Sequence, residues 1–160
     1  MDVPNVFEIY LYVAKLIQTS GLVTPAPKLL IKGLEAPSLE GMNEWLAYEM
    51  LLADPHAARR VQHEETYHFQ LTCFTADASR RSDGKIGRQY ELASIYRPLL
   101  HQQDYMLKNT CIRFKECKIS FLDLRTATFT AQAIATGGVP PLQTQSAVLL
   151  LEASIITNKD

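Results

Sequence analysis

Histidine and glutamate side chains gather at the start of the segment Val61–Phe74, where they have the chemistry to bind a metal ion. These residues are His63, Glu64, Glu65 and His68. Zinc proteases place two histidines four residues apart on one face of a helix, whereas His63 and His68 are five residues apart. On a strand, that spacing directs the two rings to opposite faces of the sheet, so they cannot share one ion. We therefore assign no metal ligands.

Cysteine thiols are the next candidates, because a thiolate is a strong nucleophile. The chain has three: Cys73, Cys111 and Cys117. A catalytic cysteine needs a general base and a polar, partly exposed setting. Cys73 instead lies on the same strand face as Phe69 and Leu71, and Cys117 on the same face as Ile119, which favours packing in a core. The spacing alone leaves a disulfide between Cys111 and Cys117 open, but the odd number of cysteines favours reduced thiols.

Motifs that activate a serine or hold a phosphate group are missing from the sequence. No serine lies in a GxSxG turn, and Gly84 and Gly87 do not form the GxGxxG or GxxxxGK patterns. We therefore expect no catalytic residues, no cofactor and no enzymatic activity.

Arginines occur as two pairs, Arg59-Arg60 and Arg80-Arg81, on either side of Val61–Phe74. Such pairs can contact nucleic acid, or they can bind acidic groups of a neighbouring protein subunit. The 16 basic and 17 acidic residues give a formal net charge of −1. This balance provides no general attraction to nucleic acid or to an anionic membrane. Solvated loop charges are therefore the default interpretation of the arginines, and contacts with acidic groups of neighbouring subunits or with nucleic acid are the alternatives.

The segment Val61–Phe74 alternates between apolar and polar residues, which predicts a long strand with one buried and one solvated face. A long strand needs a partner, and Asp54-Pro55-His56 has the composition of a turn, so we expect a hairpin with a strand at about Trp45–Ala53. A helix over residues 38–52 is the alternative. Upstream, the spacing of apolar residues predicts a helix over residues 4–19, with Asp2 as cap, and a short strand follows at Leu29–Ile31.

Downstream of the long strand, the polar loop TADASRRSDGKIG precedes a helix predicted at about Ile86–Gln103, which Pro98 should kink or split near Arg97. The remaining predicted elements are strands at 111–115 and 117–126, with a break near Leu122, a loop at 131–143 and a closing strand at 147–156. Together these elements predict one α+β domain over residues 1–160. It would have a mostly antiparallel sheet, an N-terminal helix and a second, proline-interrupted helix.

This order of elements resembles the tail terminator proteins of long-tailed bacteriophages. The resemblance is carried by FEIYLYVAKLI, ETYHFQLTCFT, ELASIYRPLL and AVLLLEASII. It implies a structural virion protein that forms a hexameric ring, ends polymerisation of the tail tube and joins the tail to the head-tail connector or neck protein. DNA would only pass through the ring transiently, and assembly would occur in the host cytoplasm. The loop at 131–143 and the long segment before Trp45 depart from shorter family members.

The resemblance also places contacts to other subunits or to the tube on two loops. The residues are Asp54, His56 and Arg59 at the hairpin tip, and Arg80, Arg81 and Asp83 before the second helix. Two alternatives stay open. One is a neck or head-completion protein of the same virion, and the other is a small ligand-binding or enzymatic α/β domain using His63, Glu64 and His68.

The N-terminal apolar run also bears on where the protein acts. It contains Glu8 and Lys15 and has no basic segment in front of it. A signal peptide and a membrane span both require an uninterrupted apolar stretch, so we expect neither of them and no membrane partner.

Overall fold

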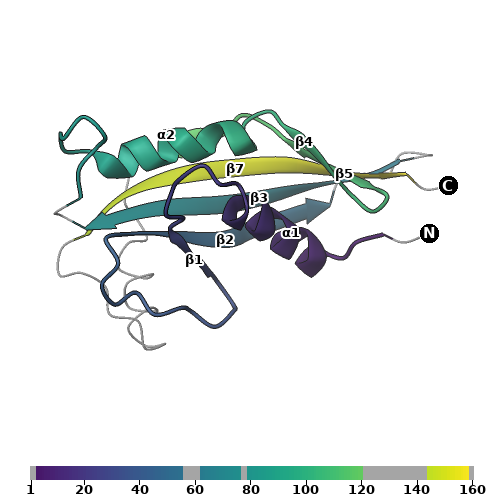
Figure 1. The fold of residues 1–160 in the computed structure, drawn as a ribbon. Helices are drawn as coiled ribbons and strands as arrows, with labels where there is room; N and C mark the ends of the chain where they lie inside the picture. The colour runs from purple at the N-terminus through teal and green to yellow at the C-terminus, as the bar shows by residue number, and fades with distance from the viewer. Residues whose placement is uncertain (1–2, 56–61, 77–78, 121–143, 159–160) are drawn as a thin grey trace.

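A computed structural model describes residues 3–55, 62–76, 79–120 and 144–158 (Figure 1). In these ranges the chain forms two helices and seven strands. The elements are α1 (Val6–Gln18), β1 (Lys28–Ile31), β2 (Glu44–Pro55), β3 (Gln62–Ala76), α2 (Arg88–Leu100), β4 (Asp104–Leu107), β5 (Thr110–Phe114), β6 (Lys118–Ser120) and β7 (Thr144–Asn158).

The strands form a single mostly antiparallel sheet in the order β1-β2-β3-β7-β5-β4, with β6 also pairing with β7. Only β1 and β2 run parallel, which is possible because the connection between them is long enough to cross back. The long strands β2, β3 and β7 lie inside the sheet, and the strands at its two edges have four residues each. The predicted α+β class with a mostly antiparallel sheet is confirmed.

Both helices pack on the same face of the sheet, and the main core lies between them and the strands. From α1 this core takes Ile9, Val13 and Ile17, and from α2 it takes Leu92 and Tyr96. The opposite face carries a second, smaller cluster at the β1–β2 side of the sheet. Its buried members are Leu30, Leu39, Trp45, Ala47 and Phe74. The sheet is therefore covered by helices on one face and partly by the chain between β1 and β2 on the other.

Helix α1 begins with a reciprocal cap at Asn5. The Asn5 side chain accepts a hydrogen bond from the Glu8 backbone at 2.8 Å, and the Glu8 carboxylate accepts one from the Asn5 backbone at 2.7 Å. This arrangement satisfies two backbone donors that the first turn leaves without helical partners. The predicted helix is confirmed, but the predicted cap at Asp2 is wrong: Pro4 precedes the cap and is not the first helical residue.

Two tyrosines attach α1 to β2. The Tyr10 hydroxyl donates to the Tyr48 carbonyl, and the Tyr48 hydroxyl donates to the Tyr10 carbonyl, each at 3.1 Å. Their rings stack with centroids 4.8 Å apart. Tyr10 also donates to the Lys32 carbonyl at 3.0 Å, so the same side chain holds the end of β1 in place.

The hairpin of β2 and β3 is confirmed, and the alternative helix over residues 38–52 is excluded because β2 pairs with β3 from Glu44 to Pro55. The prediction of Asp54 and Pro55 as turn residues is wrong, since both are paired with β3. A register shift between Met50 and Leu52 lets β2 continue past the expected end. Residue 56 and the other residues of the tip lie outside the described ranges.

The expected solvated face of β3 is also wrong over much of its length. Thr66, Gln70 and Thr72 lie on that face and are buried. Polar groups withdrawn from water need partners, and the Gln70 amide donates to the Thr72 hydroxyl at 3.3 Å. Alternation therefore predicted the strand correctly but not the environment of its polar residues.

Helix α2 is continuous from Arg88 to Leu100 and includes Pro98, so the predicted split is wrong. Pro98 lies in the last turn, where loss of one backbone hydrogen bond disturbs little of the helix. The sequence analysis missed β4, which forms a tight antiparallel pair with β5. The predicted break near Leu122 and the loop at 131–143 lie outside the described residues. The closing strand β7 is confirmed and is longer than expected.

Candidate functional site

The segment between β3 and α2 has the most organised exposed polar structure in the described chain. We call residues 79–87 the arginine loop. Ser79 fixes its start: the Ser79 hydroxyl donates to the Asn43 carbonyl at 3.2 Å. Asn43 directly precedes β2, and its carbonyl also accepts a hydrogen bond from the backbone of Ala76 at 2.7 Å. The loop is thus attached to the ends of two central strands.

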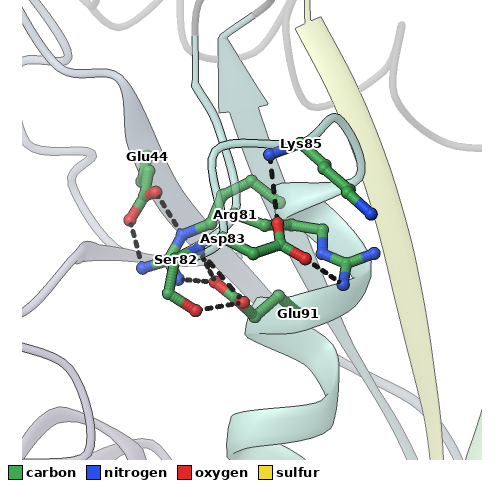
Figure 2. A network of polar contacts seen from close by, with 7 residues as sticks. Glu44, Arg81, Ser82, Asp83, Lys85 and Glu91 are labelled. Atoms are coloured by element: carbon green, nitrogen blue, oxygen red, sulfur yellow. Dashed lines mark hydrogen bonds and ion pairs between the residues drawn. The ribbon is translucent and has the colours of Figure 1, made fainter.

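Hydrogen bonds within the arginine loop fix its shape. The Arg81 backbone N–H donates to the Lys85 carbonyl, and the Gly84 N–H donates to the Arg81 carbonyl, both at 2.8 Å. Gly84 has φ of 82°, a conformation that favours glycine. The Asp83 carboxylate pairs with the Arg81 guanidinium at 2.7 Å and accepts from the Lys85 backbone at 3.0 Å (Figure 2). These contacts fix the backbone of the loop before any partner binds.

Glu91 connects the loop to α2 (Figure 2), and Arg88 connects Glu91 to Glu44 on β2. The Glu91 carboxylate accepts from the Ser82 hydroxyl at 2.8 Å and from the Ser82 backbone at 3.1 Å, and it also pairs with Arg88. Arg88 pairs in turn with Glu44 at 2.6 Å. Hydrogen bonds from Ser82 and then Arg88 lower the pKa of Glu91, and the hydrogen bond to Glu44 is the main cause of the raised pKa of Arg88.

A cavity of about 670 Å³ lies between the arginine loop, α2 and the sheet. Arg80, Arg81 and Glu91 supply its charged lining, and Ile86 and Tyr90 supply apolar surface. Ile86 is 76% exposed and Tyr90 is 37% exposed, so this apolar surface faces outward. The arrangement combines cationic side chains with an apolar surface.

One of the two predicted contact regions lies within the arginine loop. Arg80, Arg81 and Asp83 all lie in the arginine loop. Asp54 lies ten residues beyond Glu44 on β2, so about 33 Å of strand separates it from the loop. His56 and Arg59 lie outside the described residues. Asp54 and the arginine loop are therefore too far apart to belong to one continuous contact surface.

The predicted histidine and glutamate cluster lies only partly within the described residues. β3 pairs with β7 without a register break, so Glu64 and His68 lie on the same face of the sheet, and the side chain of His63 lies outside the described residues. In the described ranges, no three histidine, cysteine, aspartate or glutamate residues are grouped so that they can hold a metal ion.

All three cysteines are free, so the disulfide left open by the sequence does not form. Cys73 and Cys117 are buried, and burial raises the pKa of both thiols, that of Cys117 to about 11. Cys111 is partly exposed, and its pKa is also raised, mainly by burial. None of the thiols is activated as a nucleophile, since activation requires a lowered pKa.

Sequence reasoning missed the residues that hold the arginine loop in shape. Arg88 and Glu91 are three residues apart on one helix, a spacing at which opposite charges pair, and this signal is visible in the sequence. Glu44 is 44 residues from Arg88, and nothing local indicates that contact. The sequence predicts Ile86 as the first apolar residue of the helix, whereas it precedes the helix and faces solvent.

Neither helix in the described ranges is long and apolar enough to cross a membrane. No protein-family model matches the chain, and a search of curated proteins found no significant match.

Proposed function

We propose that this protein is a ring-forming tail terminator, a structural subunit that ends tail-tube polymerisation and joins the tail to the head-tail connector of a long-tailed bacteriophage. The proposal starts from the resemblance described above. It is supported by the order of elements, in which an N-terminal helix, a short strand, a hairpin, a second helix and closing strands follow one another.

The arginine loop is the observation that carries the proposal. It presents Arg80, Arg81 and Ile86 to solvent on a backbone fixed by contacts to both α2 and β2. A preformed loop loses little conformational entropy on binding, so it is suited to repeated, identical contacts. Arginine forms directional, two-pronged pairs with carboxylates, which favours one orientation of the neighbouring subunit.

Charge reversal in the loop tests this proposal. Native mass measurements across a range of protein concentrations should show a discrete oligomer for the wild type. Arg80→Glu with Arg81→Glu should remain folded, because both side chains are exposed, but should stay monomeric. Arg113→Glu is the matched control: Arg113 is also exposed and pairs with Asp104 at 3.2 Å, but it lies on β5.

Each outcome has a clear meaning. A wild type that is strictly monomeric at every concentration contradicts the ring. A wild-type oligomer that is unaffected by reversal at Arg80 and Arg81 retains the ring and contradicts the placement of its interface. Binding to purified tail tubes separates the terminator from a neck protein, because only a terminator should bind tube ends and prevent further growth.

A further inference from the structure

Ile86 is an exposed apolar side chain on a loop that is held by internal hydrogen bonds. At 76% it has the highest exposed fraction of the large apolar side chains in the described ranges. It follows Lys85 and precedes Gly87, which has φ of 102° and caps α2 with backbone groups only. The loop contacts described above hold Ile86 outward, so it is available to enter a pocket on another molecule.

A pocket that fits such a side chain lies at the beginning of α1. We call it the N-terminal socket. Its volume is about 340 Å³, and it is lined by Val3, Pro4, Asn5, Val6, Ile9, Glu65, Tyr67, Ile155 and Thr157. Ile9, Tyr67 and Ile155 are buried and form apolar walls, while Val3 and Val6, each 46% exposed, lie at the rim. An apolar cavity of about 150 Å³ can hold benzene, so the socket has room for an isoleucine side chain.

The socket and Ile86 lie at opposite ends of the same long strands. Thr75 on β3 lines the cavity beside the arginine loop, and Glu65 on β3 lines the socket. Ten residues of strand separate them, which corresponds to about 33 Å. Ile86 therefore cannot enter the socket of its own chain.

The charges around the two features are complementary. Arg80, Arg81 and Lys85 are exposed in the loop that carries Ile86, and Asp83 pairs with one of them. At the socket, Glu65 accepts a hydrogen bond from the Tyr67 hydroxyl at 2.7 Å. Glu8 adds a second carboxylate, which accepts a hydrogen bond from the Asn5 backbone and pairs with Lys108 at 2.9 Å. A cationic loop with an apolar tip thus matches an apolar pocket with an acidic rim.

We propose that Ile86 of one copy inserts into the N-terminal socket of a second copy, with the arginine loop of the first facing Glu65 and Glu8 of the second. Because the two surfaces are different and lie at opposite ends, the contact is head-to-tail and can close into a ring. This inference rests on the proposed ring function and specifies which surfaces form the ring.

Disulfide trapping tests the contact directly. The background carries Cys111→Ser, because Cys111 is partly exposed whereas Cys73 and Cys117 are buried. A chain with both Ile86→Cys and Val6→Cys should form, on mild oxidation, a ladder of covalent oligomers that ends at the ring size. Mixing the two single variants should give covalent dimers only. Leu34→Cys in place of Ile86→Cys is the control, since Leu34 is 40% exposed in a different turn, and it should give no ladder.

A second measurement uses Ile86→Asp, which places a carboxylate beside the acidic rim. The concentration at which half of the chains are assembled should rise at least tenfold, because a central apolar anchor is replaced by a charge of the wrong sign. Met106→Asp is the control, since Met106 is 63% exposed on the edge strand β4.

The outcomes separate this inference from the proposed function. If the wild type assembles, but the paired cysteines give no ladder and Ile86→Asp assembles normally, the socket contact is wrong and the ring remains. If the wild type does not assemble at any concentration, both are wrong. A ladder from the Leu34 control equal to that from Ile86 also overturns the contact, because it shows random collision.

Discussion

Removing the hydroxyl groups of Tyr10 and Tyr48 should measure how firmly α1 is held on the sheet. Each hydroxyl donates to the backbone carbonyl of the other tyrosine at 3.1 Å, and both residues are buried. Phenylalanine keeps the stacked rings and removes only the hydrogen bonds. The perturbation therefore isolates the polar part of the contact between α1 and β2.

The expected loss of stability depends on the hydrogen bonds that each backbone carbonyl keeps after the substitution. The Tyr10 carbonyl lies within α1, where it accepts the regular helical bond, and the Tyr48 carbonyl still accepts from the Lys32 backbone at 3.0 Å. Since the Tyr10 and Tyr48 carbonyls both keep a partner, Tyr48→Phe should lower the free energy of unfolding by about 1 kcal/mol. Tyr10→Phe should lower it by at least as much, because it also removes the hydrogen bond to the Lys32 carbonyl. The two residues are in contact, so the double variant should depart from the sum of the single variants by about 0.5 kcal/mol or more.

Urea unfolding followed by far-UV circular dichroism provides the assay. The midpoints should fall while the slope with urea stays constant, because the folded surface does not change. Tyr12→Phe is the control on the same helix, since its hydroxyl makes no hydrogen bond within the described residues. If both single variants unfold at the wild-type urea concentration, the hydroxyl contacts do not stabilise α1 and the reasoning is refuted.

Two further predictions concern titratable groups. Burial, with the nearby Glu49, raises the pKa of Tyr10 to about 12, so the unfolded chain loses that proton near pH 10 before the folded chain does. Because of Tyr10, the free energy of unfolding should fall by about 1.4 kcal/mol per pH unit between about pH 10 and 12. Tyr10→Phe should show a correspondingly shallower decline. Equal slopes for the two proteins would contradict Tyr10 as the cause. For the thiols, a maleimide at pH 7 should modify Cys111 alone in the folded protein and all three cysteines in urea. Mass spectrometry counts the modified cysteines. Rapid labelling of Cys73 in the folded state would be inconsistent with its burial.

The sequence predicts the elements whose signals are local. The periodic apolar residues Ile9, Val13 and Ile17 indicate α1, and all of them are buried in the core. Apolar residues at every second position, such as Tyr67 and Leu71, indicate β3 in the same way, and both are buried. These patterns succeed because one face of each element is covered by the core, so burial and periodicity coincide.

Features that depend on contacts distant in sequence are not predictable in this way. β2 extends to Pro55 because β3 offers a partner along its whole length, which overrides the turn composition of Asp54 and Pro55. The burial of Gln70 and Thr72 likewise depends on tertiary packing and not on strand periodicity. In the candidate site, the sequence predicts the position of the arginine loop, but the pair of Arg88 with Glu44, which connects the site to β2, is not indicated by any local pattern.

The uninterrupted pairing of β3 with β7 over 15 residues has a consequence for the size of any assembly built end to end. Inserting two residues at facing positions in both strands would lengthen the sheet by about 7 Å and keep every side chain on its own face. Inserting one residue would move every following side chain to the opposite face of the sheet and expose the apolar residues that pack in the core. Strand length can therefore change only in steps of two residues, and if the chains assemble end to end as proposed, the diameter of the ring should change in the same steps.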